Sequence, residues 1–468
     1  MAFLWRWERV RALGVQVAAL SAVLAMPVVG SAQQPTNVPD EGYYVSDDPS
    51  WEGAVSSDAV YGGAGGADVG CGGVGCGGVG CGDAVGCGDV CCGDSVCDLG
   101  PVYAGSRLWV EADYLLWKLD GNYLPPVVTS SPAGTLPANA GVLGLQTTTI
   151  LAGDEVIGGD WRGGYRIRGG VWLDDCQTIG IGGDYFNTGQ DGYDYSRSQD
   201  PNLIITRPFY NAETGLQDSQ IIAQPGELDG TVNVRAYDEL QGAGLNLRHC
   251  FWRCCNPCGP STQVDVLAGY RYYELDSSLG FSEFLTVLPT TTQPLVPGTT
   301  IDLHDQFDAR NEFHGGEIGF VGRRTCSWWW IDGAAKMAIG SNRRTVTVSG
   351  QTINTVPGGG QATFDGGLLT SEVTNIGRYS DSSTVVIPEF RLGLGGQITR
   401  NWGVHAGYNV IIWNDVARAA AHLPPGLAVD PRNLPPVTAG GGPDPAFPGI
   451  RGSQLLAHGF DFGVEFTY

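Results

Sequence analysis

GFDFGVEFTY, residues Gly459–Tyr468, is the stretch that decides the fold. Side chains of an extended strand point alternately to its two faces, so this stretch has one apolar face and one charged, glycine-rich face. The apolar face consists of Phe460, Phe462, Val464, Phe466 and Tyr468. This division suits a wall between lipid and water, and a terminal aromatic residue is typical of strands that outer-membrane assembly machinery recognises. An edge strand of a soluble β-sandwich shows the same alternation, so the rest of the chain has to decide.

The composition favours β-structure with one face in lipid. The chain has 468 residues, 72 of them glycine, and 10% of its residues are aromatic. Only 16% are charged, against about 25% in ordinary soluble domains. The formal net charge of −23 argues against nucleic acid as a partner, because phosphate binding requires a basic face.

The N-terminus indicates secretion. Arg6, Arg9 and Arg11 precede an apolar run from Ala12 to Val29, and small residues follow at Gly30-Ser31-Ala32. This order predicts a signal peptide over residues 1–32; a signal anchor is the alternative. A protein that then crosses a membrane without another long apolar run must do so as a closed barrel.

Residues 33–105 form a separate low-complexity segment that we expect to be largely disordered and rich in Cys and Gly. Its cysteines are Cys71, Cys76, Cys81, Cys87, Cys91, Cys92 and Cys97. A dinucleotide-like glycine pattern begins at Gly70, but no strand precedes it and no helix follows, so it is discarded. The cysteine spacing does not resemble paired zinc knuckles. We expect a tether that forms disulfides in an oxidising compartment, with soft-metal binding as the alternative.

Alternating segments of roughly ten residues begin at Arg107, which is the length that a tilted membrane strand needs. Two segments fit less well. Around Val234–His249 the alternation loses phase at Asp238 and Glu239, which predicts a β-bulge. In Glu312–Gly322 the alternation fits a membrane strand only if the Glu317 side chain points to the inside of the barrel. The clear segments are Leu108–Trp117, Tyr165–Leu173, Ile179–Tyr185, Gln263–Tyr273, Trp329–Ile339, Val386–Leu394, Trp402–Ile412 and Gly459–Tyr468.

The connections between these segments alternate strictly between long and short. The short ones are Asp174–Gln177, Arg253–Pro260, Arg323–Ser327 and Thr399–Asn401, and the long ones are Asp120–Asp160, Gln190–Val232, Asp276–Asp308, Gly350–Asp381 and Asp415–Ser453. Outer-membrane barrels have this asymmetry, with short periplasmic turns and long surface loops. The sequence therefore predicts an all-β protein, an antiparallel transmembrane β-barrel of about ten strands (range 8–12) over residues 106–468.

Several motifs carry a resemblance to a known family. They include LWVEADYLLWKLDG, WLDDCQTIGIGGDYF, LAGYRYYEL, GLLTSEVTNIGRYS, VVIPEFRLGLGGQIT, GYNVIIWNDVARA, DPRNLPP and GFDFGVEFTY, in order from about Arg107 to Tyr468. As a set they resemble the β-barrel porin family of type seven, found in bacteria with unusual cell envelopes. The resemblance implies an outer-membrane barrel named as a porin, and it transfers no catalytic or binding residues.

The predicted inner face carries charges of both signs. The candidate pore-lining residues are Glu111, Asp113, Arg166, Arg168, Asp265, Arg271, Asp332, Lys336, Glu389 and Arg391; Asp184, Glu317, Asp461 and Glu465 share this face. One interpretation is a pore that selects solutes by its field. The alternative is a ladder of salt bridges that fills a narrow interior, because about ten strands enclose little free volume.

The cysteines outside the tract motivate a structural alternative. Cys176, Cys250, Cys254, Cys255, Cys258 and Cys326 all fall at or beside predicted short turns. All 13 cysteines would then face the periplasm, where they could form disulfides within the chain, with other chains or near cell-wall components.

An enzyme is the remaining class. Asp302, His304 and Asp305 lie together in a predicted surface loop, with His314 on the next strand, and a His with flanking carboxylates could act as a general base. Neither HExxH nor GxSxG occurs in the sequence, so we expect no enzyme and no cofactor.

The sequence thus predicts an outer-membrane porin for passive passage of small hydrophilic solutes. The alternative is a non-conducting structural or surface envelope protein anchored through its periplasmic cysteines. Outer-membrane lipid, and the assembly machinery through the C-terminal strand, are the expected partners.

Overall fold

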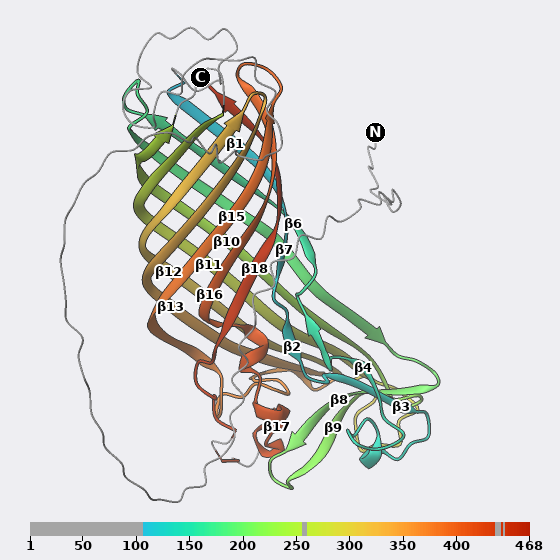
Figure 1. The fold of residues 1–468 in the computed structure, drawn as a ribbon. Coiled ribbons are helices and arrows are strands. Elements are labelled where there is room, and N and C mark those ends of the chain that lie inside the picture. Colours follow the sequence, from blue (N-terminus) through green and yellow to red (C-terminus); the bar gives the residue numbers. More distant parts are fainter. Residues whose placement is uncertain (1–105, 255–259, 436–440, 443–444) are drawn as a thin grey trace, which may run out of the picture. The chain divides into compact units, whose positions relative to one another are not determined.

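The computed structural model describes residues 106–254, 260–435, 441–442 and 445–468 (Figure 1). The predicted signal peptide and the Cys/Gly-rich segment lie outside the described residues, as do Cys255, Cys258 and the seven cysteines of the tract. Among the described residues, no helix has the length and apolar character required to cross a membrane.

In the described part of the chain, ten antiparallel strands close into a barrel, as the sequence predicts (Figure 1). They are β1 (Leu108–Leu119), β6 (Trp161–Trp172), β7 (Ile179–Ser198), β10 (Leu228–Cys254), β11 (Ser261–Val287), β12 (Thr300–Cys326), β13 (Trp329–Val356), β15 (Gly377–Gln397), β16 (Trp402–Ala417) and β18 (Gly452–Thr467). Each pairs with its neighbour in sequence order around the barrel. The first and last strands complete the ring, in register from Trp109↔Thr467 to Leu119↔Ala457.

Shorter elements gather at the long-loop end. β8 lies between β3 and β9 and also pairs with β17, β2 pairs with β5, and β14 extends the edge of β13. Their bounds are β2 (Asn122–Leu124), β3 (Val128–Pro132), η1 (Pro137–Asn139), β4 (Thr149–Ala152), β5 (Glu155–Ile157), β8 (Leu203–Asn211), β9 (Leu216–Ala223), β14 (Gly360–Asp365), η2 (Ala419–His422), η3 (Pro425–Leu427), β17 (Ala428–Val429) and η4 (Pro431–Asn433).

The predicted phase of the strands is confirmed. In β18, Phe460, Phe462 and Val464 are exposed on the outer face, whereas Asp461 and Glu465 are buried inside. The less regular segments behave as expected too. Ile318 and Phe320 are exposed while Glu317 is buried, and the register between β10 and β7 shifts between Glu239 and Gln241, where the bulge is predicted.

Three predicted long loops are largely strand. Strands β10 to β13 run for 27 or 28 residues, so the connection expected at Asp276–Asp308 contracts to residues 288–299. The connections at Gln190–Val232 and Gly350–Asp381 lose residues to strands in the same way.

The physical reason is a change of apolar phase within one continuous strand. In β11 the even positions face outward throughout, and near the short turns they carry the apolar residues Val264 and Val266. Beyond Tyr273 the apolar residues take the inward positions instead, as Leu279 and Phe281 do. The apolar outer face therefore indicates a strand only as far as Tyr272, although the strand continues to Val287.

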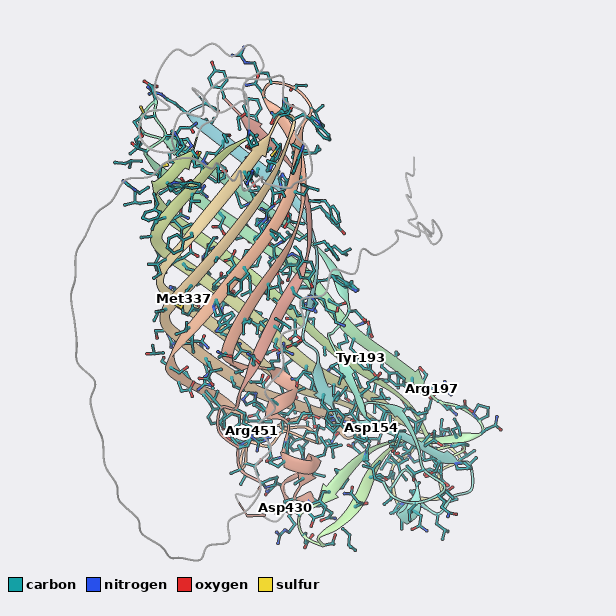
Figure 2. All side chains as sticks on the ribbon, in the orientation of Figure 1. Asp154, Tyr193, Arg197, Met337, Asp430 and Arg451 are labelled. Carbon is teal, nitrogen blue, oxygen red and sulfur yellow. The ribbon has the colours of Figure 1, made fainter. Side chains whose placement is uncertain are left out.

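A charge placed on the apolar outer face should destabilise the barrel. Met337 lies on this face, on the barrel wall (Figure 2), and so does Val404, which is 42% exposed. Replacing Met337, which lies midway along the barrel wall (Figure 2), with Arg should cost about 2–4 kcal/mol, as a charge on the lipid face away from the interfaces does. Ser349→Arg is the matched control and should cost under about 0.5 kcal/mol, because Ser349 lies on the exposed outer face of β13 toward its long-loop end. Urea unfolding of both variants in liposomes gives the comparison; equal losses would contradict the assignment of the lipid face.

The turn between β6 and β7 should respond to acid. The Asp174 carboxylate accepts hydrogen bonds from the backbone N–H of Ile179 (2.9 Å) and from the hydroxyl and N–H of Thr178, which lower its pKa to about 2. Because the folded pKa is depressed, this contribution to turn stability is present above the ordinary aspartate pKa of 3.8 and is lost as pH falls through about 2. Carboxyl NMR titration should show this midpoint, and Asp174→Asn should remove the acid dependence of amide exchange at Ile179.

Candidate functional site in the barrel lumen

All ten candidate lumen residues lie on the inner face of the barrel. Arg271 is fully buried, and six others are less than 9% exposed: Glu111, Asp113, Arg166, Asp265, Asp332 and Arg391. The side chains of Arg168, Lys336 and Glu389 are 17%, 12% and 12% exposed. Whether they line a path for solutes depends on what they contact.

Asp113 and Asp461 form the centre of a first cluster of ion pairs. Arg166 reaches both carboxylates, at 2.7 Å from Asp113 and 3.1 Å from Asp461. Arg391 joins Asp461 (3.0 Å) to Asp332. The arginines thus connect β1, β6, β13, β15 and β18 across the interior.

His405 and Asn409 complete this first cluster. His405 Nε2 lies 2.6 Å from Asp113. The Asn409 side chain accepts a hydrogen bond from Arg166 (2.8 Å) and donates one to Asp461. Strand β16, which supplies both residues, is therefore tied into the same network.

A second cluster surrounds Arg271. Its guanidinium is 2.6 Å from both Asp184 and Glu317 and 3.9 Å from Glu389. Lys336 also approaches Glu389 (3.4 Å). Nearer the short turns, Arg323 and Arg168 form ion pairs with carboxylates of β1 and β18.

These contacts agree with the salt-bridge interpretation of the inner face. One group of atoms has the geometry of a metal site, since ligand atoms of Glu111, Asp113 and His405 lie within 4.8 Å of one another. Arg166 and Arg168 already neutralise these carboxylates. Because arginines already pair with two of the three residues, we assign no metal to this cluster.

An aromatic layer crosses the lumen beyond the charged clusters. Its five side chains are at most 3% exposed, and their ring centroids lie 5.3–6.4 Å apart in a connected series. They are Trp117, Phe186, Tyr273, Phe313 and Trp413, from β1, β7, β11, β12 and β16. Leu240, Leu275, Ile387 and Leu455 pack into the same apolar cluster. Side chains packed in this way resemble a protein interior, in which few voids exceed the size of a water molecule.

This layer is not predicted from the sequence, because only charged and polar residues were assigned to the inner face. The available signal was the position of these aromatics, which stand on the charged face of their strands and at matching heights. Tyr273, for example, follows the outward Tyr272 directly.

On the long-loop side of the aromatic layer, the long loops fold into a packed cap. Inward residues of the strand extensions, such as Phe281 and Phe307, share a core with Val128, Ile205 and Ile222 of β3, β8 and β9. Figure 1 shows these short strands together at one end of the long strands. The long-loop end is therefore a folded layer with its own core.

One buried arginine joins the cap to the long strands. Arg207 of β8 lies 2.5 Å from Glu283 of β11 and 3.0 Å from Asp305 of β12. Asp305 also accepts hydrogen bonds from the backbone of Leu369 and the hydroxyl of Thr370.

The supposed general-base cluster is separated by the fold. Asp302, His304 and Asp305 lie on β12 and not in a loop. His304 pairs with Asp302 on the outer face (2.9 Å), whereas Asp305 is buried on the inner face. His314 faces outward and bonds to the Tyr270 hydroxyl, so of these four groups His304 and Asp302 alone lie together.

The four described cysteines lie in or beside the short turns. Cys176 lies in the turn after β6, and Cys254 and Cys326 end β10 and β12. The Arg253 guanidinium donates to the Cys176 carbonyl (2.6 Å), which connects two of these turns. Disulfide formation stays a prediction, since nine of the thirteen cysteines lie outside the described residues.

The family model described as "Putative beta barrel porin-7 (BBP7)" matches residues 109–468. The chain belongs to this family. The resemblance seen in the sequence is thereby confirmed, and the ten-stranded barrel is of the outer-membrane type. No curated protein sequence matches the chain.

Solved structures similar to this family member include the outer membrane protease OmpT of Escherichia coli, at 10% identity and a TM-score of 0.33, covering 78% of this chain and 97% of OmpT. A Pseudomonas aeruginosa FadL homologue is similar at 10% identity and a TM-score of 0.22, covering 78% of this chain and 91% of the homologue. At these TM-scores the likeness is too distant to bear on function.

The enclosed position of Arg271 should make it essential for stability. Arg271→Met would leave Asp184, Glu317 and Glu389 without their shared cation and should cost about 3–5 kcal/mol. Arg310→Met on the neighbouring strand is the control, because Arg310 also pairs with a carboxylate (Glu274, 2.8 Å) but its side chain is 50% exposed. Its loss should cost about 0–1 kcal/mol. Urea unfolding in detergent micelles measures both; a similar cost for the two variants would contradict the enclosed network.

Proposed function

We propose that this porin-family barrel is a non-conducting outer-membrane protein that anchors and displays the folded cap at its long-loop end. The observation that carries the proposal is the aromatic layer of Trp117, Phe186, Tyr273, Phe313 and Trp413, which fills the lumen. The core of the cap adds a second barrier above it. Ten strands also enclose less space than the 16–18 strands of channel-forming porins.

Passive passage of small hydrophilic solutes is the second candidate. It is supported by the family description and by a charged cavity of ≈ 130 Å³ in the short-turn half of the lumen. Solutes would have to displace both the aromatic layer and the cap. The closed interior therefore favours the non-conducting function.

The location and partners belong to the same proposal. A signal peptide over residues 1–32 would deliver the chain for insertion into the outer membrane, with the short turns in the periplasm and the cap at the cell surface. Assembly machinery would act on β18, whose outer face is aromatic. Outer-membrane lipid would cover the apolar outer face of the barrel. Cysteines of the turns and of residues 33–105 would form periplasmic disulfides, within the chain or to other envelope components. We propose no catalytic role, since Asp305 and His314 do not join the exposed pair of His304 and Asp302.

Planar-bilayer recordings test the proposal directly. The refolded wild-type protein should give no single-channel steps, because the lumen is closed. Trp117→Ala combined with Trp413→Ala removes two of the five aromatic side chains and should produce measurable conductance. Phe284→Ala, on the exposed outer face of β11, is the matched control and should stay silent.

Folding has to be verified in the same samples, since each Trp→Ala change in a packed layer costs about 3–5 kcal/mol. Heat-modifiable gel mobility identifies the closed barrel, which resists detergent until it is boiled. Regular conductance steps from the folded wild-type protein would overturn the non-conducting function and favour the second candidate.

A further inference from the structure

The cavity in the short-turn half of the lumen extends from the rim of the barrel to the aromatic layer. Ser106, Gln177 and Thr467 line its rim, and Trp117 and Phe186 line its inner end. Its volume of ≈ 130 Å³ provides room for a small molecule or several waters.

Most charged side chains around this cavity neutralise one another. Ten of the twelve take part in ion pairs: Glu111, Arg166, Arg168, Asp184, Arg323, Asp332, Lys336, Glu389, Arg391 and Glu465. Arg248 and Asp265 are the other two, and neither has a salt bridge to any described residue. The lumen thus leaves one cation and one anion unpaired on the wall of the same cavity.

Arg248 is held in place without a carboxylate. Its guanidinium lies over the ring of Trp109, 4.4 Å from the centroid, and its buried Nε has no hydrogen-bond partner among the described residues. Gly182 stands opposite, and a Cβ there would lie 3.1 Å from Nε. A side chain at Gly182 would therefore crowd both Arg248 Nε and Asn246 Oδ1, which lie 3.1 Å and 3.2 Å from that Cβ position.

The acceptors stand on the adjoining part of the wall. Asp265 of β11 is only 5% exposed, and its one hydrogen bond comes from the Gln263 amide (2.8 Å). Asn246 precedes Arg248 on the same face of β10, is 4% exposed, and has an Oδ1 without a partner in the described part of the chain. Enclosed groups of this kind are costly unless something satisfies them.

We propose that this cavity binds a small zwitterion of the α-amino-acid type that enters from the short-turn end. The ligand carboxylate would accept hydrogen bonds from Arg248, and the ligand ammonium group would donate to Asp265 and to Asn246 Oδ1. A guanidinium matches a carboxylate through parallel N–H donors. A molecule with both charges satisfies both unpaired residues at once, which neither a simple anion nor a simple cation can do.

Alanine is the probe that tests this site, with acetate and methylammonium as its two separate halves. Saturation-transfer NMR on the refolded full-length barrel should detect saturable binding of alanine, and each half should bind at least tenfold more weakly. Arg248→Gln and Asp265→Asn should each weaken alanine binding at least tenfold. Gly182→Ala, which places a methyl group against Arg248 Nε and Asn246 Oδ1 and removes no charge, should weaken it as well.

Lys118→Gln is the control, because Lys118 stands on the outer face of β1 and should leave alanine binding unchanged. Heat-modifiable mobility confirms that each variant is folded. Absence of saturable alanine binding to the folded wild-type protein would overturn the proposal and leave water as the occupant. Binding that survives both Arg248→Gln and Asp265→Asn would overturn it too. The outcome is independent of conductance, since a closed or an open barrel can hold this ligand.

Discussion

The seam between β1 and β18 is the constraint on which the rest of the structure depends. In hydrocarbon no water satisfies the backbone, so every N–H and C=O of a spanning strand needs a partner strand. Register pairs from Trp109↔Thr467 to Leu119↔Ala457 provide those partners for the first and last strands. Closure at ten strands in turn sets the narrow interior, and that interior can be filled by side chains reaching from opposite walls.

Filling the interior with charges carries its own requirement. A carboxylate removed from water is costly unless cations and hydrogen bonds surround it. Asp113 and Asp461 meet this requirement by sharing Arg166, with Arg168, Arg391 and His405 around them. Removing one member of such a network leaves an uncompensated buried charge, which is costly even where the intact network adds little net stability. Arg248 and Asp265 differ from it because neither forms a salt bridge with any described residue.

Much of the barrel could be predicted from the sequence because lipid imposes a simple pattern. The phases of β1, β12 and β18, the bulge near Glu239 and the alternation of short and long connections all follow from having apolar residues outside and polar residues inside. The family resemblance came from several motifs considered together, since alternation alone does not distinguish one barrel from another.

What could not be predicted lies where that pattern reverses. Toward the long-loop end the outer face of the strands meets water, so apolar residues such as Leu279 and Phe281 lie on the inner face. In the sequence such a segment lacks an apolar outer face and therefore resembles a polar loop. The aromatic layer was missed for a related reason, because Phe313 and Trp413 occupy inward positions that the lipid pattern reserves for polar groups. Only the three-dimensional register shows that such residues from five strands meet at one level, and that Asp302 and Asp305 point to opposite faces.

The continuity of the long strands has a mechanical consequence. Each of β10 to β12 has 27 residues, which extend about 90 Å at ~3.3 Å per residue. The hydrocarbon layer is only about 30 Å thick, so even steeply tilted strands rise far beyond it. Strands β10 to β12 run without interruption from the barrel wall into the cap, so the two parts share the same strands. Force applied to the cap, by an attached surface or by flow, would be carried along hydrogen-bonded strands straight into the bilayer.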